Sequence, residues 1–145
     1  ELRPYARSLP PQSFPFRTMV ACALMDISPL TYVDEEQRPL PCYHMCGGIE
    51  DGSGMLDINI HSNAIETMLG VPPERLAALS KRPEGDTARD SITTRFLEVS
   101  TYMRRFVGMA EVELEDAEAE AVVTSFHEEI VTVEDGWALL DRIRR

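Results

Sequence analysis

Alternating and continuous apolar positions predict three strands in the first sixty residues. Leucine and isoleucine alternate with polar residues over 56–60, so one face of this strand is expected to be buried and the other to face water. The mostly apolar run at residues 17–27 has the length of a buried strand. Residues 40–50 predict a further strand, and the Gly-rich segment 50–54 predicts a turn that joins it to 56–60.

Two short helices are expected after these strands. Asn63 is a suitable N-cap, and Glu66 follows three residues later, as a capping box requires. Gly70 suits the left-handed residue that ends such a helix, and Pro73 suits the first turn of the next one. Residues 81–90 are charged and contain proline and glycine, so they predict an exposed loop.

The second half of the chain predicts a helix, two strands and a last helix. Residues 91–103 place apolar side chains on one helical stripe. Residues 106–114 and 121–127 predict strands, separated by the acidic connection 115–120. A capping box at residues 132–135 begins the last helix. Its apolar stripe consists of Trp137, Leu140 and Ile143.

The order of these elements predicts the fold. Three strands, a helical interruption and two strands are the order of a five-stranded OB-fold barrel, with a capping helix after strand 3. The fold class is therefore mainly β with helices, including a C-terminal helix. An α+β sandwich with the same order of elements is the alternative.

Prolines separate the N-terminus from the domain. Four of the first fifteen residues are proline, which fixes φ and removes backbone N–H donors. Residues 1–16 are thus expected to form a Pro-rich extended arm, and residues 17–145 a single OB-fold domain. The arm is expected to be a linker or to pack on its own domain. The alternative is that apolar anchors such as Phe14 dock on a partner.

The overall charge argues against a protein that wraps nucleic acid by bulk attraction. The 145 residues contain 25 acidic and 14 basic side chains, a net charge of −11, whereas such proteins usually carry a basic surface. A local cluster of basic side chains on the surface is still compatible with this net negative charge. No apolar run approaches the roughly 20 residues of a membrane span, so no membrane partner is expected. Three cysteines, an odd number, fit a reducing compartment.

Two motifs resemble a known family. Residues 48–60 (GIEDGSGMLDINI) and 64–70 (AIETMLG) resemble the C-terminal OB domain of the replication protein A large subunit. That family has an I-x-D-x-x-G turn between two strands and an A-E-x-x-L-G helix after them. The resemblance continues at residues 96–99 and 105–112, and covers about residues 40–130. The same domain type recurs in telomere end-protection proteins.

The resemblance implies a nuclear module of a single-stranded-DNA or telomere-binding complex. In these families the last helix packs against partner OB-fold proteins. Here Trp137, Leu140 and Ile143 would provide that contact, together with Phe14 of the arm. The expected partners are other OB-fold or telomere and replication subunits, and the main expected role is protein–protein assembly. The alternative role of the C-terminal stripe is to cap the barrel.

The replication protein carries a four-cysteine zinc ribbon between its first two strands, but this chain offers only Cys42, His44 and Cys46 in the matching region. Tetrahedral zinc needs four ligands and usually takes two close pairs of thiolates. The favoured interpretation is that the cysteines are small buried hydrophobes, and no cofactor is expected. Structural zinc held by these three residues is the alternative.

Direct single-stranded DNA binding through the barrel groove is the alternative function. Residues 111–135 contain ten acidic residues and no Lys or Arg, and phosphates need cations. Single-strand binders also need aromatic stacking platforms. The side chains that could supply both are Tyr43, Lys81, Arg82, Tyr102, Arg104 and Arg105. For each aromatic residue, core packing is the competing interpretation.

The motifs of common enzyme classes are missing from the sequence. It has no P-loop, no Gly-x-Ser-x-Gly and no His-Glu-x-x-His. Cys46 and His44 lie two residues apart on one expected strand, so the histidine is poorly aimed to act as a base for the thiol. The chain is therefore expected not to be an enzyme.

Overall fold

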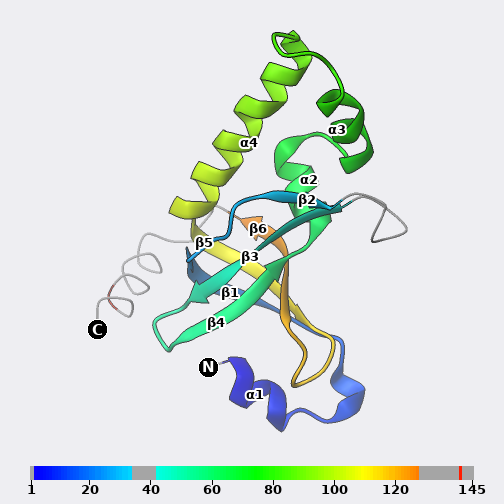
Figure 1. The fold of residues 1–145 in the computed structure, drawn as a ribbon. Coiled ribbons are helices and arrows are strands. Elements are labelled where there is room, and N and C mark those ends of the chain that lie inside the picture. Colours follow the sequence, from blue (N-terminus) through cyan, green and yellow to red (C-terminus); the bar gives the residue numbers. More distant parts are fainter. Residues whose placement is uncertain (1, 34–41, 128–140, 142–145) are drawn as a thin grey trace.

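The computed structural model describes residues 2–33, 42–127 and 141. Within these residues six strands and four α-helices are present (Figure 1). The strands are β1 (Phe16–Met25), β2 (Thr31–Val33), β3 (Cys42–Glu50), β4 (Met55–Ile60), β5 (Val107–Leu114) and β6 (Ala121–His127). The helices are α1 (Leu2–Ser8), α2 (Ser62–Leu69), α3 (Pro73–Ser80) and α4 (Thr87–Arg105), with a short 3-10 turn at Pro11–Ser13.

The sheet closes on β1. This strand pairs antiparallel with β5 over residues 16–23 and with β3 from Ala23 onward. β3 pairs antiparallel with β4, β4 pairs parallel with β6, and β6 returns antiparallel to β5. Five strands thus form one closed circuit, which confirms the OB-fold barrel and excludes the sandwich. The short β2 adds to the edge of β3.

One end of the barrel is filled by α2, as the sequence predicts. Ile65 is fully buried and Leu69 is 2% exposed, and both belong to the core that the inward residues of the strands form. Gly70 adopts a φ of 71° and ends the helix as expected. The cap differs from the prediction: His61, not Asn63, is the N-cap, and its Nδ1 accepts the Asn63 N–H at 3.2 Å.

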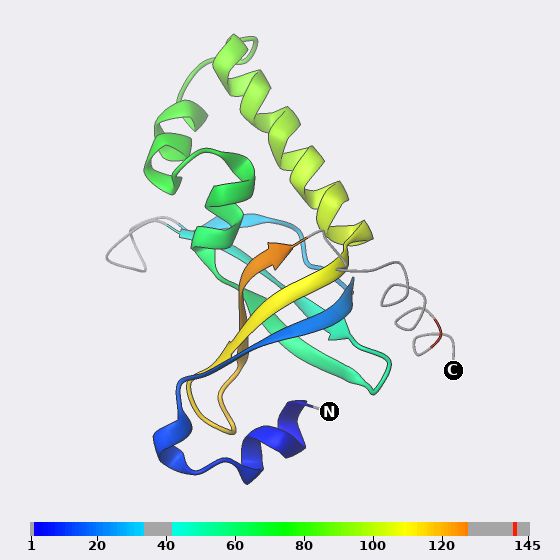
Figure 2. The ribbon, with the colours of Figure 1, turned by 180° about the vertical axis from the view of Figure 1, so that it is seen from behind.

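The expectation of an extended arm is wrong for residues 2–8, which form α1. Pro4 lies in the first turn, where backbone N–H groups have no partner within the helix, so proline is tolerated there. Ala6 is fully buried in the core, and Leu2 and Phe14 pack against it. The N-terminal segment therefore packs on its own domain, and Figures 1 and 2 show α1 at the barrel end opposite α2.

The segment that contains α4 also differs from its prediction. The expected loop at residues 81–90 ends early, because the Asp86 carboxylate accepts the N–H groups of Ala88 and Arg89 at 3.0 and 3.2 Å. This cap starts α4 four residues before the expected position, and the helix continues to Arg105. Its inward stripe is the predicted one. Apart from Asp141, the expected C-terminal helix lies outside the described residues.

Replacing Ile65 by Ala tests whether α2 holds the barrel end together. The deletion removes fully buried methyl groups, so the free energy of unfolding should fall by about 2–5 kcal/mol. Leu97→Ala is the matched control in a helix, because Leu97 is 67% exposed and its loss should change stability by about 0.5 kcal/mol or less. Urea unfolding measures both, and equal effects would contradict the packing described.

Asp86→Asn tests the cap of α4 through pH. Hydrogen bonding from the Arg89 N–H, aided by Arg82 and the Ala88 N–H, lowers the pKa of Asp86. A carboxyl whose pKa is lower when folded stabilises the protein above its unfolded pKa, and this contribution is lost as pH falls through the folded value. The difference in thermal midpoint between wild type and D86N should hold from about pH 5 to pH 7 and shrink below about pH 4. A difference that is the same at pH 3 and pH 6 would contradict this role.

Candidate binding surfaces

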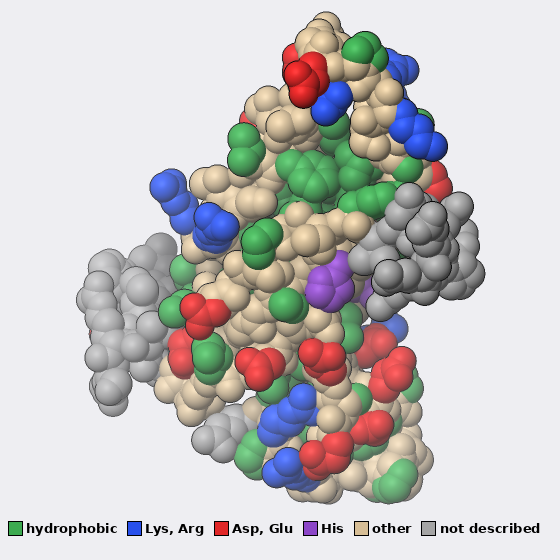
Figure 3. Space-filling model, viewed as in Figure 1, with side chains coloured by type: hydrophobic (Ala, Val, Ile, Leu, Met, Phe, Trp, Pro, Cys, Tyr) green, Lys and Arg blue, Asp and Glu red, His purple; other side chains and the backbone are tan. Residues whose placement is uncertain are grey.

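The outward face of β3 and β4 is the surface on which OB folds commonly bind oligonucleotides. Alternate residues of these strands, such as Tyr43, Met45 and Ile58, point into the core. The residues between them face outward: Cys42, His44, Cys46, Gly48, Glu50, Met55, Asp57 and Asn59. None of these eight is Phe, Tyr, Trp, Lys or Arg, and the one ring among them is the imidazole of His44. Figure 3 shows Asp and Glu side chains gathered over the lower half of the barrel.

The loop between β5 and β6 commonly closes over the ligand in this fold, and here it is acidic and held by α1. Arg3 donates to the carbonyl oxygens of Ala117 and Ala119. Arg7 binds the Glu118 carboxylate with two hydrogen bonds, of 2.8 and 3.1 Å. The Arg7 guanidinium lowers the pKa of Glu118. The arginines nearest this loop thus bind the protein itself.

Tyr43, expected as a stacking platform, is a core residue. Its side chain is 2% exposed, and its hydroxyl donates to the Val71 carbonyl at 2.8 Å. Its ring meets that of Phe96 edge-on, with 6.2 Å between centroids. Burial, with smaller contributions from nearby acidic groups, raises the pKa of Tyr43 to about 12. The competing interpretation, core packing, therefore describes this residue.

The four predicted cationic residues lie at opposite ends of α4. Lys81 and Arg82 precede the helix, and Arg82 lies 3.5 Å from the Asp86 carboxylate. Arg104 and Arg105 end it. A helix of 19 residues is about 28 Å long. Arg104 and Arg105 lie within one turn of Tyr102, whose ring packs against Phe106, but the structure does not bring the six predicted residues onto one surface.

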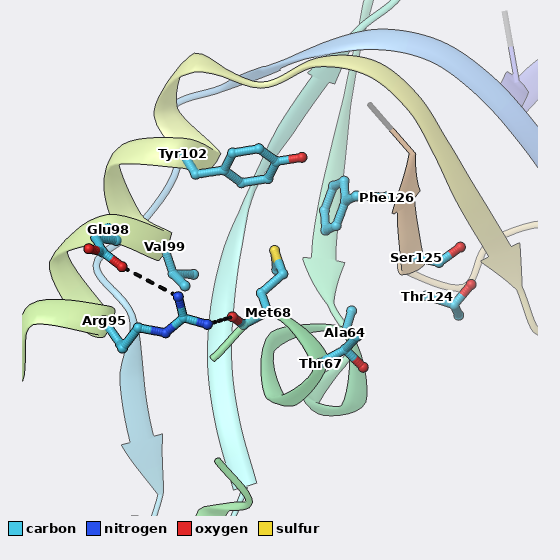
Figure 4. A pocket seen from close by; sticks show the side chains of 10 residues that line it. All are labelled: Ala64, Thr67, Met68, Arg95, Glu98, Val99, Tyr102, Thr124, Ser125 and Phe126. Atoms are coloured by element: carbon cyan, nitrogen blue, oxygen red, sulfur yellow. Dashed lines mark hydrogen bonds and ion pairs between the residues drawn. The ribbon is translucent and has the colours of Figure 1, made fainter. Parts of the chain in front are cut away.

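Tyr102 lines a cavity of about 390 Å³ between α2, α4 and β6. Its floor and walls are largely apolar, with Met68, Val99 and Phe126, and Figure 4 shows these side chains around one space. At its edge Arg95 donates to the Met68 carbonyl at 3.2 Å and lies 3.5 Å from Glu98. Such a hollow suits an apolar side chain. Sequence reasoning missed it because its walls come from three elements that are far apart in the chain.

The predicted partner-binding residues are only partly described. Phe14 is half-buried and packs against the domain's own core, and its contact with a partner stays a prediction. Trp137, Leu140 and Ile143 lie outside the described residues, and their contact with a partner stays a prediction.

The predicted zinc ligands share one face of β3, but no group of three His, Cys, Asp or Glu side chains in the described part of the chain could hold a metal ion. Cys42 and Cys46 are half-buried, and His44 is exposed. Cys22 is fully buried in the core, where burial raises the pKa of its thiol to about 12, so this thiol stays protonated.

In residues 2–33 and 42–127, no helix is long and apolar enough to cross a membrane.

The chain was compared with known proteins. No curated protein matches it. A solved structure, yeast RPA bound to ssDNA, is similar to it at 12% identity and a TM-score of 0.41, covering 99% of this chain and 93% of that chain. A specific match to the replication protein A large subunit or to telomere proteins stays a prediction. The family model for the C-terminal OB-fold of RecQ-mediated genome instability protein 1 matches residues 9–143. The chain, whose barrel has the topology of this fold, therefore belongs to the family of that C-terminal OB-fold domain.

Proposed function

We propose that this domain is a non-enzymatic, nuclear OB-fold module that acts in protein–protein assembly within a genome-maintenance complex. One observation carries the proposal: the outward face of β3 and β4 has no Lys or Arg to bind phosphates and no Phe, Tyr or Trp on which bases could stack. The family to which the chain belongs is named for genome instability, which supports the setting. An OB fold without its usual ligand chemistry is free to serve as a scaffold for other proteins.

The electrostatics of the barrel end support the same choice. The β5–β6 segment carries Glu115, Asp116, Glu118 and Glu120, and phosphates approaching this loop would meet like charges. Arg3 and Arg7 bind this segment, so their two positive charges offset only part of its four negative charges, and their guanidinium groups are engaged within the domain. Repulsion between these carboxylates and the phosphates of a nucleic acid would weaken binding, most of all at low salt, where charges are screened least.

The proposed partner is another OB-fold subunit of a replication, telomere or related complex. The sequence places Trp137, Leu140 and Ile143 on one stripe of an expected helix, and a Trp with aliphatic neighbours is typical of the centre of an interface. The resemblance to OB-fold families that assemble through their last helix favours this segment.

A second candidate function is direct binding of single-stranded DNA. The observation in its favour is the exposed pair Arg104 and Arg105 at the end of α4, one turn from Tyr102. Two cations and one ring give a short contact, whereas the site sizes of OB folds are about 4–16 nucleotides. This makes DNA binding the weaker candidate.

Fluorescence anisotropy with a labelled 20-nucleotide single strand separates the two functions. The proposal predicts no saturable binding by the chain at 20 mM or 150 mM salt. Arg104→Glu/Arg105→Glu should then behave like wild type. Saturable binding that weakens with salt and is lost in the double variant would instead establish the α4 end as a DNA site.

Trp137→Ala/Leu140→Ala tests the assembly role. Wild-type chain should capture an OB-fold subunit from a nuclease-treated nuclear extract, identified by mass spectrometry. The double variant should lose about tenfold or more of that capture, because residues at an interface centre carry most of the binding energy. Leu97→Ala, exposed on α4, is the control and should capture normally. Capture that survives the double variant would contradict the proposed contact.

A further inference from the structure

Exposed apolar side chains of this domain gather on one side of the barrel. Of the six large hydrophobic residues that are exposed in the described part of the chain, two lie on β1, one on its neighbour β5, one on α1, and one on β4 on the far side of β3. These five are Tyr5, Met19, Met25, Met55 and Val107, with exposed fractions of 54, 43, 45, 57 and 41%. The sixth, Leu97, lies on α4. Since single exposed hydrophobic residues are ordinary but a contiguous patch is not, this grouping needs an explanation.

Strand register shows that the patch is continuous along β1 and β5. Outward residues of β1 are Met19, Ala21, Ala23 and Met25, and those of β5 include Val107 and Met109. Ala21 lies opposite Met109, and Ala23 lies opposite Val107. Directly opposed residues of antiparallel strands have Cβ atoms about 4.5–5.5 Å apart. Figure 2 shows β1 and β5 side by side along the barrel.

The patch extends across β3 to β4 at one end and to α1 at the other. Met25 lies opposite Gly48, and the side chain of Met55 covers this glycine: a Cβ there would lie 3.0 Å from the Met55 Cγ and Sδ. At the other end, Tyr5 and Met19 line one shallow hollow together with Met109. The surface bounded by these residues is called the methionine face below.

Carboxylates surround the methionine face. Glu111 lies opposite Met19, Glu50 opposite both Ala23 and Met55, and Asp57 follows opposite Gly48. Asp51 lines the same hollow as Tyr5. The two arginines nearby are engaged within the domain: Arg17 pairs with Glu113, and Arg3 donates to the β5–β6 loop. The face is therefore apolar along β1 and β5, with Glu111 and Asp57 beside it and Glu50 between Ala23 and Met55.

We propose that the methionine face is a docking surface for a basic amphipathic helix of a partner protein, one that presents leucine-like side chains flanked by lysine or arginine. This inference rests on the proposed role in protein assembly, and it names a second surface of the domain. Methionine side chains are unbranched and polarizable, so they adapt to differently shaped apolar partners. The surrounding carboxylates select a basic partner by charge complementarity.

The same charges distinguish this partner from others. A nucleic acid would be repelled by Glu50, Asp57 and Glu111. A second copy of this acidic chain would bring like charges together around the patch. An amphipathic helix with cations beside its apolar stripe satisfies both the apolar side chains of the face and the carboxylates next to them.

The chain carries its own reporters for the test. The chain has seven methionines, and the ε-methyl group of each gives one NMR signal after ¹³C labelling. Met19, Met25, Met55 and Met109 lie on the methionine face, Met45 and Met103 are buried in the core, and Met68 lines the α2–α4 cavity. The probe is a synthetic basic amphipathic peptide, (LKKLLKL)₂, and its acidic counterpart (LEELLEL)₂ is the control. Both are titrated into the 145-residue chain at 100 mM salt.

The proposal predicts saturable shifts at the four methionines of the face and none at Met45 and Met103 with the basic peptide, and no shift with the acidic one. In M19Q/M25Q/M55Q, affinity measured by anisotropy should fall about tenfold or more, while L97Q, which also removes an exposed apolar side chain, should bind like wild type. Circular dichroism verifies that both variants fold.

Several results would overturn the proposal. Shifts confined to Met68 would place the peptide in the α2–α4 cavity, and unchanged affinity in the triple variant would reduce the binding to general charge attraction. Shifts that depend on protein concentration without peptide would make a second copy the occupant. Shifts on deletion of residues 128–145 would make the chain's own terminus the occupant. None of these bears on capture of an OB-fold subunit through Trp137 and Leu140, so the two proposals fail separately.

Discussion

The parallel pairing of β4 with β6 is the constraint on which the rest of the structure depends. Ile58, Asn59 and Ile60 pair with residues 121–123, and this short contact converts a curved sheet into a closed barrel. Parallel strands cannot be joined by a tight turn. The chain therefore leaves β4 through three helices and returns through β5 before it reaches β6. One consequence is that α2 lies at the barrel end and buries Ile65 there.

Closure also determines which surfaces remain for binding. A closed barrel leaves few free strand edges, so recognition falls to outward side chains, loops and helix ends. Around this barrel the outward side chains of β3 and β4 are mostly polar or acidic, whereas the exposed apolar side chains gather along β1 and the adjoining end of β5, with Met55 of β4 beside them. The Lys and Arg side chains expected to bind DNA lie at the two ends of α4, and the arginines of α1 bind the β5–β6 segment. The arrangement favours protein partners over nucleic acid.

The sequence predicted the barrel because its strands follow simple rules. Alternation at residues 56–60, the Gly-rich turn before them and Gly70 at the helix end are local signals, and each appears where expected. His61 was missed as a cap because Asn63 is the residue type usually found there, and Asp86 was missed because the charges, proline and glycine of residues 81–90 predict a loop. Residues 2–8 were misjudged because proline was treated as excluding helix, although a first turn tolerates it.

The surfaces were harder to predict than the fold. Tyr43 appeared as a possible stacking residue, but whether a strand residue faces inward depends on register across the whole barrel. The α2–α4 cavity joins residues from 64 to 126, and the methionine face joins residues from 5 to 109. No local pattern reveals such groupings, because they arise only when the barrel closes.

The central claim is that the β3–β4 face of this OB fold does not serve nucleic acid. Amide chemical-shift mapping with a 20-nucleotide single strand at 20 mM salt tests it most directly, because it locates any contact on the barrel. The account predicts no saturable shifts at outward residues such as His44, Asp57 and Asn59, nor in the β5–β6 loop. Saturable shifts at these positions, weakening as salt rises, would contradict it.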